Sequence, residues 1–432
     1  MSNTSSNTSS NTSSNTSKRQ TILLAVVFGA IGFIAPFASN GTVVLLLLGV
    51  LAVPVLARAE ALRWRFLDPL LVTGLAVLVA WSMVSTLWAP GPSFTSSLRT
   101  AGVILAGLLL VKTAWHLDAN ARRVARIAVM AGILAAMLFF AIELATTASI
   151  TRMLRGIALA DFRVPDGFNP VSRGTAVLAL LLWPAVAGIW RVWGKPAWSI
   201  MTIAAAATIA LLLPMLAGFL AISVGAVTFA LAYRFRRATL AVMAAAFVAY
   251  AVAAPVLSTT VLGPELLSKV KTGIPLSWEH RLGIWRHVAG KALERPWRGH
   301  GFDASRYLGR EGETVKALKG RTRLEALPLH PHNAALQLWL ELGIIGIAAF
   351  LLIFAGIVRT IWSHGGHAIL GAAATASLAS YLTVALLSFG VWQSWWHATA
   401  WLGAGALVLY GRHPLIPRQS EDRDSGPGKT AA

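Results

Sequence analysis

Two histidines in one short polar segment, His330 and His332, are the side chains best placed for proton transfer. Imidazole titrates near neutral pH, so the ring of His332 could accept a proton from a hydroxyl group, whereas His330 is expected to be structural. Both stand where a charged segment ends and a long apolar stretch begins. Asn333 follows at once and can cap a helix there by accepting hydrogen bonds from its free N–H groups. Two interpretations of His332 stay open at this point: a general base, or a residue that only caps the helix or binds a loop carbonyl.

Asn333, Gln337 and Glu341 recur every four residues and therefore form one polar stripe on the apolar helix that we predict to run to Ile357. A carboxylate inside an apolar segment normally faces the protein interior and marks a functional site. We expect Glu341 to orient Gln337 or a neighbouring helix, with direct substrate contact as the alternative. Two glycines further along this helix are expected to permit close helix packing: Gly343 and Gly346.

An amphipathic helix is predicted from Ser277 to Leu293, and it carries Arg281 and Trp285. We expect it to lie across the outer membrane face with one apolar side, made by Leu282, Trp285, Ala289, Ala292 and Leu293. Arg281 is either an anion-binding group or an ordinary solvated helix residue.

A zinc site that joins His300 to His330 and His332 is a further alternative. The sequence offers no second pair of ligands and contains no cysteine, so we predict no metal, no disulfide and no cofactor.

The composition predicts a membrane protein. Hydrophobic residues make up 56% of the chain and charged residues 12%, and apolar runs long enough to cross a bilayer recur throughout. The net charge of +20 does not indicate nucleic acid, because Lys and Arg gather at the ends of the apolar runs. We predict an all-α polytopic membrane protein with about twelve transmembrane helices and one large, partly helical outer loop.

Basic clusters follow every second predicted span, which places both chain ends in the cytoplasm. Pro214 marks either a tight outer turn or a kink within one helix. Tryptophans 392, 395 and 396 are expected to form an interfacial aromatic belt, with sugar stacking as an alternative for one of them. The predicted organisation is a disordered cytoplasmic tail at 1–17, transmembrane helices one to nine at 18–256, the large outer loop at 257–332, transmembrane helices ten to twelve at 333–411 and a disordered cytoplasmic tail at 412–432.

The outer loops carry a positive charge that works against the topological signal. The segment 257–332 holds thirteen Lys and Arg against seven Asp and Glu, and the shorter segment 148–173 contains Arg163 and Arg173. Basic residues kept on the outer side indicate an anionic ligand. For Arg173, at the lip of the next span, snorkelling to lipid headgroups is an equal alternative.

These residues carry a resemblance to a known family. The order of polar residues and glycines resembles the signature of the bacterial O-antigen ligase family, which also includes O-antigen polymerases and bacterial O-linked oligosaccharyltransferases. The matching positions are Ser277, Arg281, Trp285, Pro296, Gly299 and Gly301, followed by His332, Asn333, Gly343 and Gly346. Around Pro214, many relatives carry a Ser-Arg pair that this chain lacks, which leaves one phosphate contact to other arginines.

The resemblance implies a metal-independent, inverting membrane glycosyltransferase of the GT-C type in the bacterial inner membrane, with its active site on the periplasmic face. The donor would be a glycan on undecaprenyl diphosphate, and the acceptor would be a hydroxyl of lipid A-core, in lipopolysaccharide biosynthesis. His332 would act as the base and Arg281 would bind the diphosphate. Further substrate contacts would come from Arg173, Arg163, Asn333, His330 and Trp285, with Glu341, Gln337, Gly343 and Gly346 in support.

Three other functions remain as alternatives. A polymerase would lengthen the glycan on its own carrier, but polymerases more often need a second large outer loop, and 148–173 is short. A protein O-oligosaccharyltransferase would use the same donor. A transporter of lipid-linked glycans would predict internal repeat symmetry, and no clear repeat is present.

Overall fold

A computed structural model gives the fold and describes residues 18–52, 67–164, 166–261, 276–309, 312–316, 323–364 and 368–411. The predictions for the two tails, 1–17 and 412–432, lie outside these residues. A helical segment from Lys18 leads into α2. The helices are α2 (Ile31–Phe37), α3 (Thr42–Val50), α4 (Pro69–Ser85), α5 (Phe94–His116), α6 (Ala119–Ala145), α7 (Ser149–Arg155), α8 (Asn169–Ser172), α9 (Gly174–Trp193), α10 (Pro196–Leu212), α11 (Leu216–Thr260), α13 (Leu276–Glu294), α14 (Ser305–Leu308), α15 (Ala334–His364), α16 (Ala368–Leu387) and α17 (Ser394–Gly411).

The prediction of an all-α polytopic membrane protein is confirmed. Within the described residues, eight helices are long and apolar enough to cross a membrane, and α3 with its preceding turn and α10 are shorter apolar helices. The predicted spans 216–233 and 238–256 run together as α11, whose backbone leaves the helical region at Phe235 (φ −131°, ψ 48°). At Pro214 the two helices α10 and α11 are separate, because the residues on either side, Leu213 and Met215, are extended. The turn, and not the kink, is therefore the correct interpretation there.

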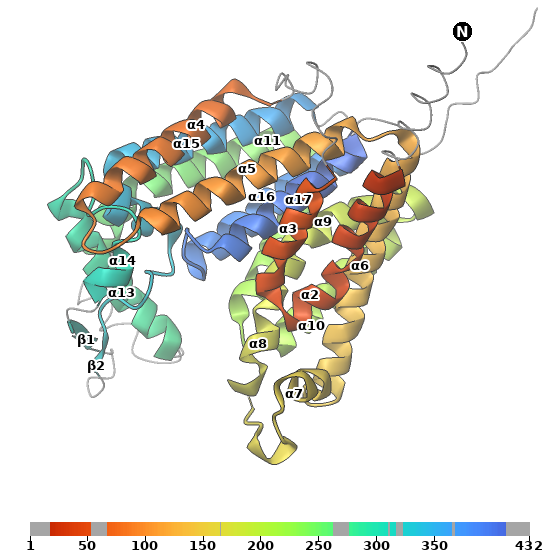
Figure 1. The fold of residues 1–432 in the computed structure, drawn as a ribbon, viewed down its shortest axis with the longest axis horizontal. Coiled ribbons are helices and arrows are strands. Elements are labelled where there is room, and N and C mark those ends of the chain that lie inside the picture. The colour runs from red at the N-terminus through yellow and green to blue at the C-terminus, as the bar shows by residue number, and fades with distance from the viewer. Residues whose placement is uncertain are drawn as a thin grey trace, which may run out of the picture.

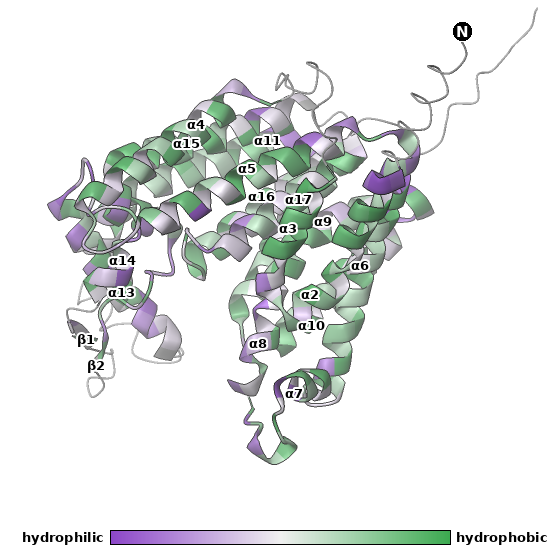
Figure 2. Cartoon of the chain, viewed as in Figure 1, coloured by the Kyte–Doolittle hydropathy of each residue, from purple (hydrophilic) through white to green (hydrophobic). Residues whose placement is uncertain are grey.

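The helices form a bundle from which two arms project on one side (Figure 1). Helix α15 packs against α4, and α11 packs against α16. One arm consists of α13, α14 and a short antiparallel hairpin of β1 (Thr314–Lys316) and β2 (Arg323–Glu325). The other consists of α7 and the segment that leads to α8. Hydrophobic residues cover the long helices, while hydrophilic residues are frequent near helix ends and in the α13 arm (Figure 2).

Side-chain caps explain where several helices begin. Asp68 accepts a hydrogen bond from Leu70 N at 2.9 Å and is followed by a proline, so α4 begins there. Asp118 caps α6 in the same way. Asn333 accepts from Leu336 N at 3.1 Å, which confirms the predicted cap of α15. Helix α15 thus begins immediately after the two histidines.

Helix α15 is interrupted at Gly343, where φ is +63° and ψ is −156°. Leu340 O and Glu341 O, which would otherwise accept hydrogen bonds from the next turn, accept instead from His300 N and Gly301 N, both at 2.8 Å. The break therefore leaves these two buried carbonyl groups satisfied. It also fixes the 296–301 turn of the α13 arm onto the middle of α15.

This contact corrects the role predicted for Gly343. A Cβ atom on Gly343 would lie 2.5 Å from Trp297 O, and one on Gly299 would collide with the backbone of α15. The two glycines therefore permit a loop, and not a second helix, to approach α15. The nearest neighbours of a Cβ on Gly346 would be atoms of Leu342 in the same helix. Close helix packing is thus replaced by a loop contact at Gly343, and at Gly346 it stays a prediction.

Helix α13 confirms the predicted amphipathic helix with nearly the same bounds. Its buried apolar side chains are those of Ile284, Val288, Ala289 and Ala292, whereas Leu293 is 43% exposed. The buried face is therefore rotated relative to the predicted one. It packs against α11 and α15, and its position across the outer membrane face stays a prediction.

Candidate active site

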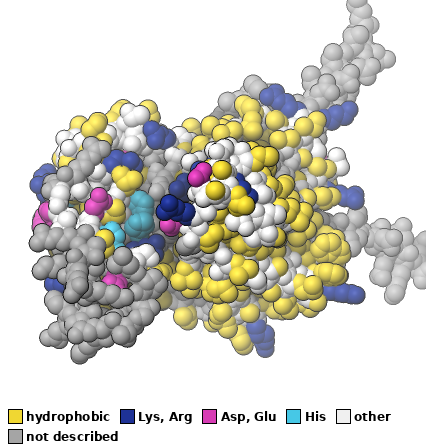
Figure 3. All heavy atoms as spheres, turned by 90° about the horizontal axis from the view of Figure 1, so that it is seen from below, with side chains coloured by type: hydrophobic (Ala, Val, Ile, Leu, Met, Phe, Trp, Pro, Cys, Tyr) yellow, Lys and Arg dark blue, Asp and Glu magenta, His cyan; other side chains and the backbone are white. Residues whose placement is uncertain are grey.

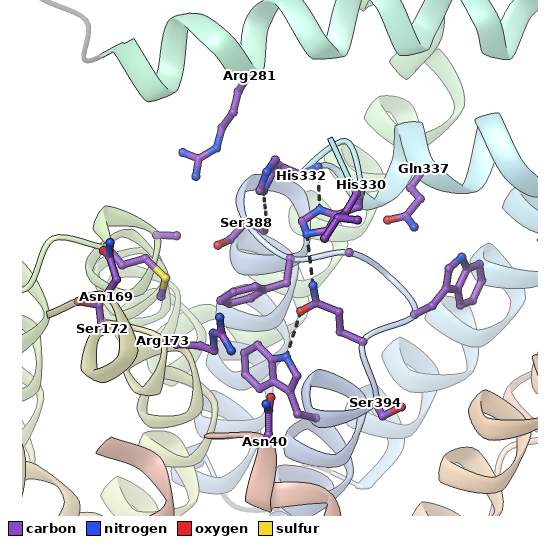
Figure 4. A pocket seen from close by; sticks show the side chains of 18 of the residues that line it. Asn40, Asn169, Ser172, Arg173, Arg281, His330, His332, Gln337, Ser388 and Ser394 are labelled. Atoms are coloured by element: carbon purple, nitrogen blue, oxygen red, sulfur yellow. Dashed lines mark hydrogen bonds between the residues drawn. The ribbon is translucent and has the colours of Figure 1, made fainter. Parts of the chain in front are cut away.

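A cavity of about 920 Å³ lies between the two arms, and five of the predicted site residues line it: Arg173, Arg281, His330, His332 and Gln337. Figure 3 shows histidine side chains in the hollow between two lobes, with basic side chains beside them. Figure 4 shows Arg281 reaching toward His332 from α13, and Arg173 approaching from the other arm. The lining comes from α3 and its preceding turn, α5, α13, α14 with Asp303 before it, α15, the turn between α10 and α11, and the segments 166–173, 329–332 and 388–395.

His332 is held in one orientation and one tautomer. Its backbone has φ +56°, in the left-handed region, and its Nδ1 forms a short hydrogen bond with Ser388 O. A carbonyl oxygen only accepts, so Nδ1 carries the hydrogen and Nε2 is the basic nitrogen. Nε2 has no hydrogen-bond partner among the described residues. Burial lowers the pKa of His332 below its ordinary value, and the bond to Ser388 opposes that effect, while the charge of Arg281 adds to it. The ring is therefore neutral at neutral pH and can accept a proton at Nε2.

His330 and Trp285 support the turn that carries His332. Trp285 Nε1 donates to Pro331 O at 2.9 Å. His330 Nδ1 lies 3.3 Å from His332 N, and its Nε2 lies 3.2 Å from Gln393 Nε2. A neutral imidazole has one acceptor nitrogen, so His330 can accept from only one of these donors at a time. Burial is the main cause that lowers the pKa of His330 to about 3, which keeps it neutral. Of these two predicted substrate contacts, His330 lines the cavity and Trp285 does not.

Four arginines line the cavity: Arg99, Arg173, Arg281 and Arg306. Arg173 and Arg281 are where the sequence prediction places them. Arg163 is exposed and is not part of the lining, so its predicted phosphate contact finds no support in the fold. Sequence reasoning missed two of the four: Arg306, one of thirteen basic residues in the outer loop, and Arg99, which stands inside an apolar run.

Of the polar stripe on α15, only Gln337 lines the cavity, and Asn333 and Glu341 bind neighbouring residues behind it. Asn333 Nδ2 donates to Tyr250 OH at 2.6 Å and does not reach the lining. Gln337 does line the cavity, and its Oε1 accepts from Val391 N at 2.9 Å. This bond ties α15 to the segment that carries Ser388.

Glu341 connects α15 to the turn before α14 and to the segment that carries Trp392. Its carboxylate is fully buried and accepts from Asp303 N at 2.9 Å, from Ser305 N at 3.3 Å and from Gln337 Nε2 at 3.1 Å. The Ser305 hydroxyl and the Trp392 indole N–H donate to it as well. Glu341 does not line the cavity. The structure therefore supports the prediction that it orients Gln337 and its neighbours, and not the alternative of substrate contact.

The Glu341→Gln substitution is expected to destabilise the protein. Donors face both carboxylate oxygens, so the amide NH₂ of glutamine would meet buried N–H groups whichever way it turned. A buried donor left unsatisfied costs about 1–3 kcal/mol, more beside a charge. A lower thermal midpoint in detergent should follow. The exposed Glu294, at the end of α13, supplies the control Glu294→Gln, and an equal midpoint for both variants would contradict this role of Glu341.

The predicted aromatic belt is wrong. Trp396 is 1% exposed and Trp395 is also buried, so neither anchors the chain at a membrane surface. Trp392 and Trp395 line the cavity instead. The alternative of sugar stacking by one of these rings remains a prediction.

One side of the cavity is apolar. Val43, Met215, Leu216 and Phe389 line it, together with Pro214 in the turn between α10 and α11. In this turn the chain lacks the Ser-Arg pair that many relatives carry. A cavity lined by both cations and apolar side chains suits an amphiphile that carries an anionic head and a hydrocarbon tail.

The zinc alternative finds no support. His300 Nε2 contacts Lys291 O at 2.9 Å. Over the described part of the chain, no three His, Asp or Glu side chains gather as a metal ligand set. The donors that such a site requires are therefore not brought together there.

Comparison with known proteins agrees with this geometry. A family model described as O-antigen ligase matches residues 216–351, which include Arg281 and His332. Over 334 residues the chain is 30% identical to a Rickettsia felis protein named "putative polysaccharide ligase", a match that covers 77% of this chain and 78% of that protein. A Rickettsia prowazekii protein with the same description is 29% identical over 320 residues, covering 74% and 76% of the two chains. The match to the family model includes His332 and helix α13, and the matches to the two relatives cover 77% and 74% of the chain. This chain therefore belongs to the O-antigen ligase family.

Proposed function

We propose that this protein is a polysaccharide ligase that transfers a glycan from undecaprenyl diphosphate to a hydroxyl group of lipid A-core, with inversion at the anomeric carbon. The observation that carries the proposal is the fixed tautomer of His332 in a cavity lined by four arginines. The names of the relatives support a polysaccharide substrate. The apolar side of the cavity supports a lipid-linked donor.

The reaction needs one base and a set of cations. The acceptor oxygen attacks the anomeric carbon and forms the new glycosidic bond, while its proton passes to His332 Nε2. The bond between the anomeric carbon and the phosphate oxygen breaks, and its electron pair leaves with the diphosphate. Arginine side chains bind phosphate oxygens through a planar fork and stabilise the departing charge, so no general acid is required. Attack opposite the leaving group inverts the anomeric carbon in a single displacement.

The distribution of charge supports an outer location for this chemistry. Both arms that border the cavity belong to segments for which the sequence predicts an outer location, and basic residues mark the opposite ends of the spans. We propose the bacterial inner membrane as the location, with the cavity facing the periplasm and both chain ends in the cytoplasm. The partners are then two lipids, the donor and the acceptor.

An assay with purified protein, lipid-linked glycan and lipid A-core, with and without a chelator, tests this function. We expect lipid A-core to shift in a single step on a gel, and the shift to survive chelation, because the proposed step uses no metal. A ladder that grows on the lipid carrier would indicate a polymerase, and glycan on added protein would indicate an oligosaccharyltransferase. Either of these, or no product from a folded sample, would overturn the proposal.

A further inference from the structure

Asp303 is a buried carboxylate in the cavity wall that the proposed reaction does not yet use. It lies in the turn before α14 and lines the cavity, and its backbone N donates to Glu341 Oε2 at 2.9 Å. Its φ of +58° is in the left-handed region. Asp and Asn tolerate this region better than most residues, but it still costs free energy, and such strain gathers at functional sites. The contact with Glu341 holds the strained backbone in place.

The carboxylate of Asp303 holds one arginine by a single nitrogen. Arg306 Nε donates to Asp303 Oδ2 at 3.2 Å. The Asp303 side chain is 7% exposed and that of Arg306 is 46% exposed, so the carboxylate is set back and the guanidinium extends into the cavity. Only Nε is used by the pair. The two terminal nitrogens have no hydrogen-bond partner among the described residues, and they form the edge of a planar fork that matches phosphate oxygens.

A second cation lies on the same wall. Arg99 lines the cavity from α5, and it is close enough to Asp303 for its charge to favour the ionised carboxylate. Burial raises the pKa of Asp303, while Arg306, a hydrogen bond from Ser96 and the charge of Arg99 lower it. Two arginines thus act on one carboxylate in this wall, Arg306 through a hydrogen bond and Arg99 through its charge.

We propose that Asp303 is a positioning residue that aims the free edge of Arg306 into the cavity, where Arg306 and Arg99 bind the diphosphate of the donor. The inference rests on the proposed function and deepens it. The leaving diphosphate carries the largest negative charge in the reaction, and a carboxylate that fixes the guanidinium reduces the entropy lost when phosphate binds. Asp303 itself does not bind the phosphate, because a carboxylate and a phosphate repel each other, and it acts through Arg306.

The test measures binding of undecaprenyl diphosphate, without glycan, to the purified full-length protein in detergent. Asp303→Asn keeps the size of the side chain and its tolerance of positive φ but removes the charge. We expect the Kd for undecaprenyl diphosphate and the donor KM to rise about tenfold, as for loss of a charge-assisted contact. The acceptor KM and the thermal midpoint should change little. Arg306→Lys keeps the charge, loses the fork and should weaken binding by a similar factor.

The double variant separates positioning from a structural role. If Asp303 acts through Arg306, the combined variant should bind no more weakly than Arg306→Lys alone. Additive losses, an unchanged Kd in Asp303→Asn, or a rise confined to the acceptor KM would overturn the inference. Arg295→Lys, at an exposed arginine outside the cavity lining, is the matched control. If Asp303→Asn does not fold, wild-type affinity in Arg306→Lys would overturn it equally. Because binding is measured without an acceptor, this result is independent of whether the protein is a ligase.

Discussion

The His332→Asn variant is expected to fold normally and to lose glycan transfer by a factor of about 10²–10⁴, the usual contribution of a general base. Asparagine tolerates the positive φ at this position, and its Nδ2 can replace Nδ1 as the donor to Ser388 O. What it lacks is a basic nitrogen at the position of Nε2. The variant therefore removes the base and keeps the turn. His332→Ala should be equally inactive.

Single-turnover transfer at saturating donor and acceptor is the measurement. His280, whose ring contacts Glu325 O outside the cavity, gives the control variant His280→Asn. An active, well-folded His332→Asn protein would remove this residue from the chemistry and leave it as a cap of the turn.

The pH dependence follows from the same assignment. Burial lowers the pKa of His332 below 6.5, and only the neutral ring can accept a proton. The rate should therefore change little as the pH falls from 8 to 7 and decline as His332 becomes protonated, with a midpoint below the ordinary imidazole value of 6.5. An acidic limb that begins above pH 7 would point to another base.

The sequence predicts most of the fold because its information is local. Apolar runs, basic clusters and cap residues such as Asp68 and Asn333 define the helices and their ends. The polar stripe that contains Glu341 is also predicted correctly as interior. What local patterns do not contain is the partner of each element. From the sequence, Gly343 is therefore predicted to permit helix packing, whereas in the structure the turn 296–301 of the α13 arm contacts α15 at this break.

The residues of the cavity also divide into those that local sequence patterns indicate and those that only tertiary packing brings together. His332 and Arg281 stand out because their neighbours in the chain are unusual, whereas Arg99 is brought to the cavity only by the packing of α5. Arg163 shows the opposite error, since positive charge in an outer loop does not determine which way a side chain faces. Trp396 has a sequence context typical of a membrane interface and is nevertheless buried by tertiary packing.

Arg281→Ala is expected to reduce kcat/KM for the donor by about 10²–10³, similar to the loss of one preorganised donor to a developing oxyanion. The guanidinium lies 5.0 Å from the centre of the Trp278 ring and extends into the cavity, and it forms no salt bridge with the residues that the structure describes. Burial lowers its pKa, which reflects a cation held partly out of water without a counter-ion. A lipid diphosphate would supply the missing negative charge.

Arg286 lies on the same helix, is exposed and faces a separate groove, so Arg286→Ala separates the loss of a general positive charge from the loss of this one. Arg281→Lys tests the geometry, because lysine keeps the charge but cannot bind two phosphate oxygens through a fork. If Arg281 acts on the departing diphosphate, the alanine variant should lose more in kcat than in donor KM. A loss confined to KM would mean that Arg281 only binds the donor, and full activity would mean that Arg173, Arg99 and Arg306 stabilise the leaving group without it.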